Sequence, residues 1–330
     1  MYRTFLFMTA ASLSMSAPSA TQPAEIAAIS AQAVSSRTPA GMAVDWSISP
    51  SSRDGQVQLR LSYRTDRGNS NNSDNRPVSE LRGLDLRASG PVSFQIAEEA
   101  GALQCTGVMQ DMRGGGICRF SPDARFAAEL ERRGIGSATT EQMYQMTVGG
   151  VRLALVDELD RLGYTRPTVN NLVEAGIFGI DVPYVREMAE TGYRVGSMSR
   201  LVEFKIHGVT PEYVRAMAQS GYRDIAPQRL VEYRIHGVTP EFVRGMAEAG
   251  YRDLPGNRLV EFRIHGVSPE FVRGLAELGY RELSASQLVE FRIFGVTPAF
   301  IREVQGQGVR SASAQELVEM RMFGRRRDRD

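Results

Sequence analysis

The sequence has little lysine, no long apolar run outside its N-terminus and almost no net charge. Lys205 is the only lysine among 39 basic residues, so a cation site in this chain must use planar, bidentate guanidinium contacts. The net charge of +1 gives no general attraction to nucleic acid or to an anionic membrane. No later segment approaches about 18 consecutive apolar residues. We therefore expect no nucleic-acid partner and no transmembrane segment in the mature chain.

Sequence signatures of common enzymes are also absent. There is no H-E-x-x-H for a zinc peptidase and no G-x-S-x-G for a serine hydrolase. A Ser-x-x-Lys motif is excluded because Val202 stands three residues before the only lysine. The stretch "RGGGIC", residues 113–118, lacks the lysine and the following helix of a phosphate-binding loop. We expect a protein that is not an enzyme and that requires no cofactor.

The N-terminus is typical of an exported protein. An arginine, an apolar segment and small residues predict a cleavable signal peptide over residues 1–19, with an uncleaved anchor as the alternative. Residues 20–43 are rich in Ala, Ser, Thr and Pro and are expected to form a linker. The predicted location is therefore periplasmic or secreted.

Only two cysteines occur, and they flank a glycine-rich turn. A hairpin centred near Asp111 and Met112 would place Cys105 opposite Cys118. In an oxidising compartment this pair is expected to form a disulfide that stabilises the fold by roughly 2–3 kcal/mol. Two buried free thiols are the alternative.

Residues 44–120 have the period-two pattern of β-strands. "GQVQLRLSYR" alternates apolar and polar residues, as a half-buried strand does. The polar stretch "DRGNSNNSDNRP" between two apolar segments is expected to be a loop. The region predicts a small antiparallel β domain of five to seven strands.

From residue 121 to residue 324 the apolar residues recur with the period of an α-helix, and one 29-residue sequence is repeated. Full copies begin at residues 143, 172, 201, 230, 259 and 288, and each predicts two short helices that end at glycine. Capping boxes are expected at three helix starts: Thr139-x-x-Gln142, Ser284-x-x-Gln287 and Ser313-x-x-Glu316. In the first helix of a copy, the side chains of Leu201, Phe204 and Ile206 are expected to face the core.

One helix pair is too small to bury its own apolar faces. Stacked copies can cover one another, which predicts an α-solenoid of helix–turn–helix repeats. The fold class expected for the whole chain is α+β and multidomain, with the β domain before the solenoid. Residues 325–330 form a charged tail that is expected to be disordered.

The three histidines share one repeat position: His207, His236 and His265. Equivalent residues of stacked helices lie about 9–10 Å apart, whereas zinc ligands lie about 2 Å from a common centre. Other copies have phenylalanine at this position: Phe178, Phe294 and Phe323. We therefore expect a packing position for a planar ring, in which Glu203, Glu232 and Glu261 could pair with histidine, and no metal site.

Two rows of arginine also recur in register. The candidate partner-binding residues are Arg215, Arg244 and Arg273 on the second helices, and Arg234, Arg263 and Arg292 on the first helices. Such rows can form a charged ladder for an acidic or extended partner. The alternative is a solvated surface on which the arginines pair with neighbouring glutamates.

Two stretches resemble a known family. "FSPDARFAAELERRGIG" after "GVMQDMRGGGICRF", and the repeats "HGVTPEFVRGMAEAGY", resemble segments associated with or fused to antirepressor-type membrane metallopeptidases, the β-lactam-sensing receptor family. The resemblance covers roughly residues 44–324 and does not include the peptidase part. It implies an extracytoplasmic sensory or accessory module. No catalytic residue carries over, because no matching motif is present.

These observations lead to one functional hypothesis and one alternative. The hypothesis is an exported, non-enzymatic interaction or scaffold module that binds a protein partner through the repeat array, in envelope sensing or signalling. The alternative is a protein that binds a ligand or a cell-wall component through the β domain.

Overall fold

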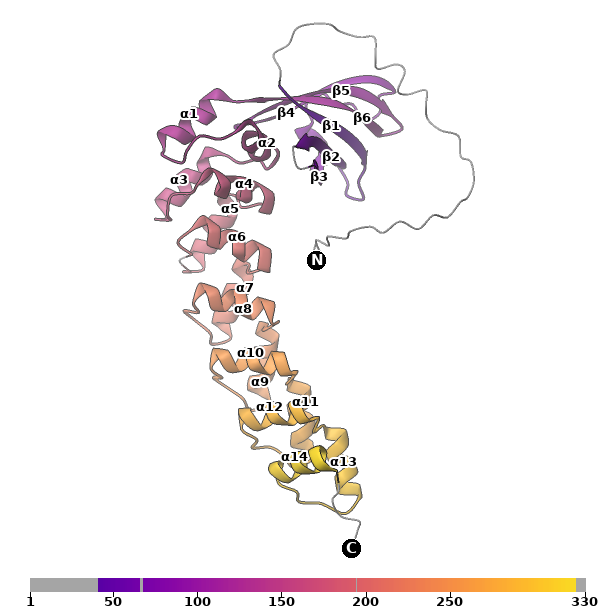
Figure 1. The fold of residues 1–330 in the computed structure, drawn as a ribbon, viewed down its shortest axis with the longest axis vertical. Helices are drawn as coiled ribbons and strands as arrows, with labels where there is room; N and C mark the ends of the chain where they lie inside the picture. Colours follow the sequence, from indigo (N-terminus) through magenta and orange to yellow (C-terminus); the bar gives the residue numbers. More distant parts are fainter. Residues whose placement is uncertain (1–40, 66–67, 194, 325–330) are drawn as a thin grey trace, which may run out of the picture. The chain divides into compact units, whose positions relative to one another are not determined.

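The computed structural model describes residues 41–65, 68–193 and 195–324. In these ranges an antiparallel sheet is followed by a series of helices, which is an α+β arrangement (Figure 1). The described residues from Gly41 onward belong to one unit, in which the sheet and the helices share a core. The expected signal peptide and charged tail, and nearly all of the linker, lie outside the described residues. No helix in the described part is long and apolar enough to span a membrane.

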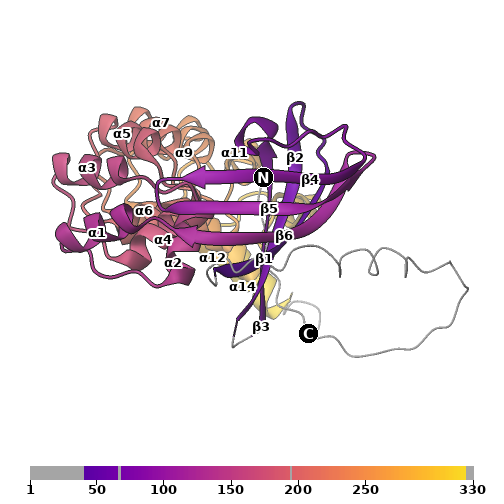
Figure 2. The same ribbon diagram turned by 90° about the horizontal axis from the view of Figure 1, so that it is seen from above.

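The sheet has six strands, and each pair of neighbours is antiparallel. The strands are β1 (Met42–Pro50), β2 (Gln56–Thr65), β3 (Gly68–Pro77), β4 (Gly90–Glu98), β5 (Gly101–Gln110) and β6 (Arg113–Pro122), with a short 3-10 helix, η1 (Val78–Glu80), after β3. Their order across the sheet is β3-β2-β1-β6-β5-β4. Figure 2 shows several of these strands side by side from above. The expected antiparallel β region is confirmed.

The prediction of a polar loop between strands is wrong at Gly68–Pro77, which forms the edge strand β3. This strand pairs with β2 over its whole length, from Thr65 opposite Gly68 to Gln56 opposite Pro77. Its residues are mostly polar and exposed, so it lacks the alternation of apolar and polar residues that predicts a half-buried strand. An edge strand needs a partner on one side only, and backbone hydrogen bonds to that partner do not depend on apolar side chains.

The disulfide hairpin is confirmed. Cys105 on β5 lies opposite Cys118 on β6, and their sulfur atoms are bonded. Asp111 and Met112 form the turn with φ angles of 49° and 60°, the left-handed values that a two-residue hairpin turn requires at both positions. Both cysteines are fully buried in the core of the sheet.

Fourteen helices lie in the described residues after the sheet. They are α1 (Ala124–Arg132), α2 (Thr140–Val148), α3 (Leu153–Arg161), α4 (Val169–Phe178), α5 (Val182–Glu190), α6 (Met198–His207), α7 (Pro211–Gln219), α8 (Pro227–Ile235), α9 (Pro240–Glu248), α10 (Gly256–His265), α11 (Pro269–Glu277), α12 (Ala285–Phe294), α13 (Pro298–Gly306) and α14 (Ala314–Phe323). We call the even-numbered helices from α2 to α14 the first helices and the odd-numbered helices from α3 to α13 the second helices.

The first and second helices form two rows. Each first helix contacts the next first helix, and each second helix contacts the next second helix. Figure 2 looks along these rows and shows α3, α5, α7 and α9 on one side of α4 and α6. At the sheet end, α2 packs on β4, β5 and β6. There the ring of Tyr144 meets the rings of Tyr63 and Phe120 edge-on at 5.0 and 5.6 Å.

Local signals set the helix ends. All three expected capping boxes are present, at Thr139, Ser284 and Ser313. A fourth box, Thr168 with Asn171, was not predicted, because asparagine replaces the glutamate or glutamine of the usual pattern. Glycines in the left-handed conformation follow both kinds of helix, such as Gly208 after α6 and Gly221 after α7. The glycine stops were therefore read correctly from the sequence.

Contacts between neighbouring helix pairs recur at a spacing of 29 residues. One set is made by tyrosine hydroxyls, which each donate to a carbonyl 32 residues later: Tyr193 to Ile225, Tyr222 to Leu254, Tyr251 to Leu283 and Tyr280 to Ala312. Each bond links the end of a second helix to a loop further along the chain. The end of α5, for example, is linked to the loop before α8. In these four copies equivalent tyrosines thus have equivalent partners.

Candidate partner-binding surface

Isoleucines are exposed at one equivalent position of consecutive first helices. They are Ile177, Ile206, Ile235, Ile264 and Ile293, with exposed fractions of 53–62%, and Met322 follows at 44%. We call these six side chains the apolar row. Each lies at or next to the last residue of its helix.

The expectation that Ile206 points inward is therefore wrong. Leu201 and Phe204 are fully buried, as expected, but Ile206 is 53% exposed. Helical geometry gives the reason, because a residue two positions after Phe204 lies about 200° further around the helix. The side chain is placed by its angle on the helix and not by its apolar character.

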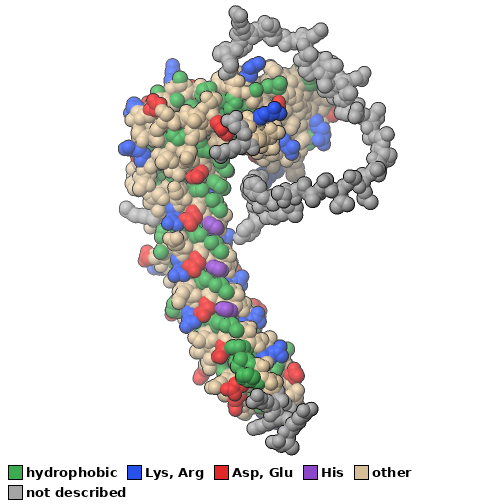
Figure 3. Space-filling view, in the orientation of Figure 1, with side chains coloured by type: hydrophobic (Ala, Val, Ile, Leu, Met, Phe, Trp, Pro, Cys, Tyr) green, Lys and Arg blue, Asp and Glu red, His purple; other side chains and the backbone are tan. Residues whose placement is uncertain are grey.

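The residue after each member of the apolar row carries a planar ring. The rings belong to Phe178, His207, His236, His265, Phe294 and Phe323. The histidines are half-buried, and the phenylalanines are 36–68% exposed. In Figure 3 the three histidines, in purple, follow one another along this face with green apolar side chains beside them. The apolar row and the rings form one continuous feature of the first helices.

The glutamates expected beside the histidines have other partners. Glu203, Glu232 and Glu261 form ion pairs with the arginines three residues before them, which are Arg200, Arg229 and Arg258. No group of three or more His, Cys, Asp or Glu side chains within the described ranges is placed to hold a metal ion. The backbone carbonyls of the three histidines accept hydrogen bonds from arginines of the following first helices.

The candidate arginines on the second helices are neutralised locally. Each forms an ion pair with the glutamate three residues before it: Arg215 with Glu212 at 3.6 Å, Arg244 with Glu241 at 2.9 Å, and Arg273 with Glu270 at 2.8 Å. These glutamates are 70–73% exposed. The arrangement matches the solvated, self-paired alternative, and exposed pairs of this kind contribute little to stability.

The candidate arginines on the first helices have a different environment. Arg234, Arg263 and Arg292 donate from Nε to the carbonyls of His207, His236 and His265, at 3.4, 3.3 and 3.2 Å. Each thereby satisfies a carbonyl at the C-terminal end of the preceding first helix, where cations are favoured.

Each of these guanidinium groups also lies over an aromatic ring of a second helix. Arg234 lies 4.9 Å from the ring centre of Tyr213, Arg263 lies 5.1 Å from that of Phe242, and Arg292 lies 4.9 Å from that of Phe271. Arg321 has the equivalent place, 5.2 Å above Phe300. The carbonyl bond and the ring together hold the guanidinium plane in a fixed orientation.

These four arginines have no carboxylate within 4.0 Å among the residues that the structure describes. We call Arg234, Arg263, Arg292 and Arg321 the unpaired arginine row. Lys205 takes the equivalent place over Tyr184 at 3.9 Å. Burial lowers the pKa of the Lys205 amine, while the charges of Asp181 and Glu187 raise it. The charges of Asp181 and Glu187 therefore act on the amine of this lysine.

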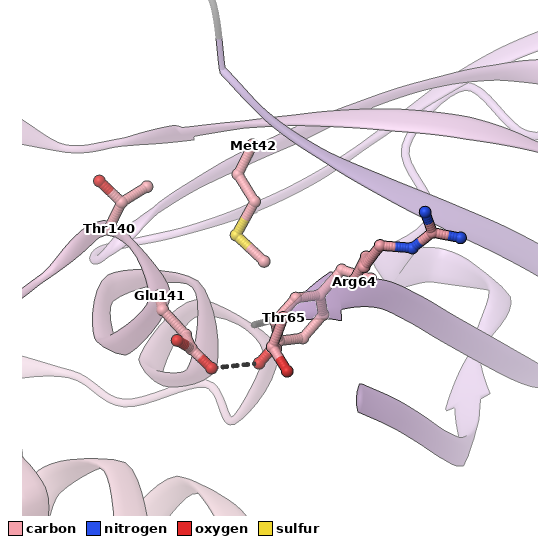
Figure 4. Close-up of a pocket in the computed structure, with 6 residues that line it drawn as sticks. Met42, Arg64, Thr65, Thr140 and Glu141 are labelled. Atoms are coloured by element: carbon pink, nitrogen blue, oxygen red, sulfur yellow. Dashed lines mark hydrogen bonds between the residues drawn. The ribbon is translucent and has the colours of Figure 1, made fainter. Parts of the chain in front are cut away.

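The β region offers a shallow depression beside α2. It has a volume of about 290 Å³ and is lined by Met42, Tyr63, Arg64, Thr65, Thr140 and Glu141 (Figure 4). The Tyr63 hydroxyl donates to Glu141 at 2.9 Å, and burial raises the pKa of Tyr63. Arg64 extends away from Glu141. The lining offers one bonded tyrosine–carboxylate pair.

No family model matches the chain, and no curated protein matches it significantly.

The apolar row is the part of the surface that the sequence analysis missed. The signal was present, since in α6, α8, α10 and α12 an isoleucine occurs two residues after a buried ring. Only its angular position on the helix identifies it as exposed.

Proposed function

We propose that this chain is a non-enzymatic interaction module that binds a protein partner through its stacked helix pairs. The supporting observation is the apolar row, in which isoleucine is more than half exposed at the same position of five consecutive first helices. Single exposed apolar residues are normal on a protein surface, whereas apolar side chains repeated along one face are typical of an interaction site.

The stacking of the helices suits this function. Helix pairs that contact mainly their neighbours form a solenoid, and in a solenoid every surface position is repeated at a regular interval. Such an array offers an extended partner a series of equivalent contacts. We propose this solenoid as the framework of the binding surface.

We place the partner in the cell envelope. The buried Cys105–Cys118 disulfide suits an oxidising compartment, and the N-terminal sequence is that of an exported protein. The resemblance to segments that accompany β-lactam-sensing receptors is in keeping with an accessory role in envelope sensing or signalling.

Site-specific photo-crosslinking in the producing cells tests the proposal. A photoreactive amino acid at position 264, in the apolar row, is expected to give a discrete crosslinked product whose second component is a protein. Position 277 supplies the matched control, because Glu277 is an exposed residue near the end of the second helix α11. The same product from both positions, or no product from position 264, would contradict the proposal.

A further inference from the structure

The partner's chemistry follows from a comparison of three arginine rows on the same array. Three arginines of the second helices, Arg215, Arg244 and Arg273, each pair with the glutamate three residues before them. The arginines near the start of the first helices, Arg200, Arg229 and Arg258, pair with glutamates three residues later. The unpaired arginine row has no carboxylate within ion-pair distance in the described part of the chain. The arginines in the loops after the second helices have none either, but they do not belong to the first helices that carry the apolar row: Arg223, Arg252, Arg281 and Arg310.

The unpaired arginine row lies beside the apolar row. Arg234 bonds to the carbonyl of His207, the residue that directly follows Ile206. Arg263 stands in the same relation to Ile235, through the carbonyl of His236. In Figure 3 both red and blue side chains lie near the purple histidines along this face. A ligand that covers Ile206, Ile235 and Ile264 therefore meets a guanidinium group at each of these positions.

The guanidinium groups of the row are already oriented to bind an anion. In Arg234, Arg263 and Arg292 the Nε atom is occupied by a backbone carbonyl and the guanidinium plane lies on a ring, while the two Nη atoms have no partner among the described residues. Arginine binds carboxylates through such N–H groups in a planar geometry. A side chain that is already held loses little rotamer freedom when it binds.

The spacing of the row favours an extended peptide. Packed helices lie about 8–10 Å apart, so successive arginines are expected at about that interval. A polyproline II segment advances about 3.1 Å per residue and completes a turn in three residues, which gives about 9.3 Å per turn. Every third residue of such a segment faces the same side and can meet successive arginines.

We propose that the array binds an extended acidic segment of a protein, with a carboxylate at about every third residue and apolar side chains between the carboxylates. The carboxylates bind the unpaired arginine row, and the apolar side chains cover the apolar row. The inference rests on the proposed function and adds the chemical class of the partner.

An anionic membrane fits this surface less well than a peptide does. The ion-paired glutamates Glu203, Glu232 and Glu261 belong to the same first helices, and a continuous sheet of negative charge would meet them as well as the arginines. A narrow peptide can follow the arginines and avoid the glutamates. A peptide with carboxylates at a regular interval therefore matches the spaced arginines better than a continuous anionic surface does.

The test uses the full mature chain and two synthetic peptides, one of repeated Glu-Leu-Pro triplets and one of repeated Lys-Leu-Pro triplets. We expect the acidic peptide to bind at least about tenfold more tightly than the basic one, with an affinity that falls as salt rises. Equal binding of the two peptides would overturn the inference. Tighter binding to vesicles containing phosphatidylglycerol than to the acidic peptide would also overturn it.

A pair of matched variants assigns the binding to the row. Arg263→Gln with Arg292→Gln is expected to weaken binding of the acidic peptide roughly tenfold, since each lost contact accounts for a few-fold change. Arg244→Gln with Arg273→Gln, on neighbouring second helices, is expected to leave it unchanged because glutamates already neutralise these arginines. Equal losses in both variants would overturn the assignment. The peptide comparison on the unaltered chain does not depend on how well either variant folds.

The crosslinking at position 264 separates this inference from the proposed function. A crosslinked protein whose contact segment is basic or uncharged would leave the interaction function standing and would overturn the acidic-peptide inference. An absent crosslink would remove both. A crosslinked acidic segment supports both.

Discussion

Arg76 is one of three polar or charged side chains buried in the described part of the chain. It extends from the edge strand β3, forms ion pairs with Asp74 at 3.2 Å and Glu80 at 3.3 Å, and donates to the carbonyl of Val148 at the end of α2. This single side chain therefore ties the sheet to the first helix that packs on it.

Loss of the Arg76 guanidinium is expected to destabilise the chain. Arg76→Met keeps much of the apolar stem but leaves the Val148 carbonyl and the carboxylates of Asp74 and Glu80 without this donor, which costs about 2–3 kcal/mol in the free energy of unfolding. Urea denaturation measures the change. Arg60→Met on β2 is the control, because Arg60 is exposed. A similar loss in both variants would contradict the role assigned to Arg76.

Glu158 on α3 gives a pH-dependent contribution to stability. Its side chain is 4% exposed and lies between Arg161 and Arg186. Hydrogen bonds from these two guanidinium groups lower the pKa of Glu158 from 4.5 to about 2. A carboxylate whose pKa is lower in the folded state stabilises the fold above its unfolded pKa, and this contribution is lost as the pH falls toward the folded pKa.

Glu158→Gln is therefore expected to be less stable than the unaltered chain at neutral pH, and the difference should shrink between pH 4.5 and about 2. Denaturation midpoints of the two proteins across this range measure it. Other carboxylates are common to both proteins and cancel in the difference. A constant difference down to pH 2 would contradict the assigned pKa.

At the scale of elements, the tyrosine hydroxyls at one repeat position differ in their hydrogen bonding. Most donate to a carbonyl of a neighbouring helix pair, and one has no acceptor among the described residues. Tyr222 and Tyr280 donate to the carbonyls of Leu254 and Ala312, both at 2.7 Å. Tyr164 occupies the equivalent place, but its buried hydroxyl has no partner among the described residues. The carbonyl that it would use, that of Gly196, accepts from the backbone of Thr165. Burial raises the pKa of Tyr164 to about 12.

The same substitution is thus expected to have different effects at two equivalent positions. Tyr222→Phe should lower the free energy of unfolding by about 1 kcal/mol through the lost hydrogen bond. Tyr164→Phe should be neutral or slightly stabilising, because it removes a buried hydroxyl without a partner. Urea denaturation of the two variants tests this, and equal destabilisation would contradict the assigned bonding.

The helix elements could be predicted largely from the sequence because their signals are local. A capping box such as Ser284 with Gln287, and a glycine stop such as Gly208, involve residues a few positions apart. The disulfide hairpin was predictable for the same reason. The strand β3 was missed because its partner β2, and not its own polar side chains, makes it a strand.

The candidate site was predictable only in part. The arginine rows were visible as a 29-residue recurrence, but which row has carboxylate partners depends on side-chain geometry. Glu241 lies three residues before Arg244 and pairs with it, whereas Arg263 reaches back to the carbonyl of His236, 27 residues away. The second relation crosses between helix pairs and has no local signature.

At the scale of the whole molecule, contacts between neighbouring helix pairs imply that a unit can be removed without loss of the rest. Deletion of residues 230–258 removes one 29-residue copy and joins Arg229 to Leu259, so that the "LVEFRIH" sequence is kept in phase. We expect this chain to fold with its remaining helices, since the neighbouring copies present the same faces to each other.

Circular dichroism and urea denaturation measure the outcome of this deletion. The control removes residues 230–248, which breaks the phase of the copies, and this chain is expected to lose cooperative unfolding. If the in-phase deletion unfolds the array as completely as the out-of-phase deletion, the helix pairs are not equivalent units and the solenoid proposal is wrong.

The most direct test of the central claim is the affinity of the crosslinked partner for a chain with Ile235→Ser and Ile264→Ser. These side chains are 58% and 57% exposed, so the variant should fold with nearly unchanged stability. We predict an affinity at least about tenfold lower than that of the unaltered chain, because the apolar contacts of two units are lost. An unchanged affinity, or an equal loss in Glu248→Ser with Glu277→Ser on the second helices, would contradict the account.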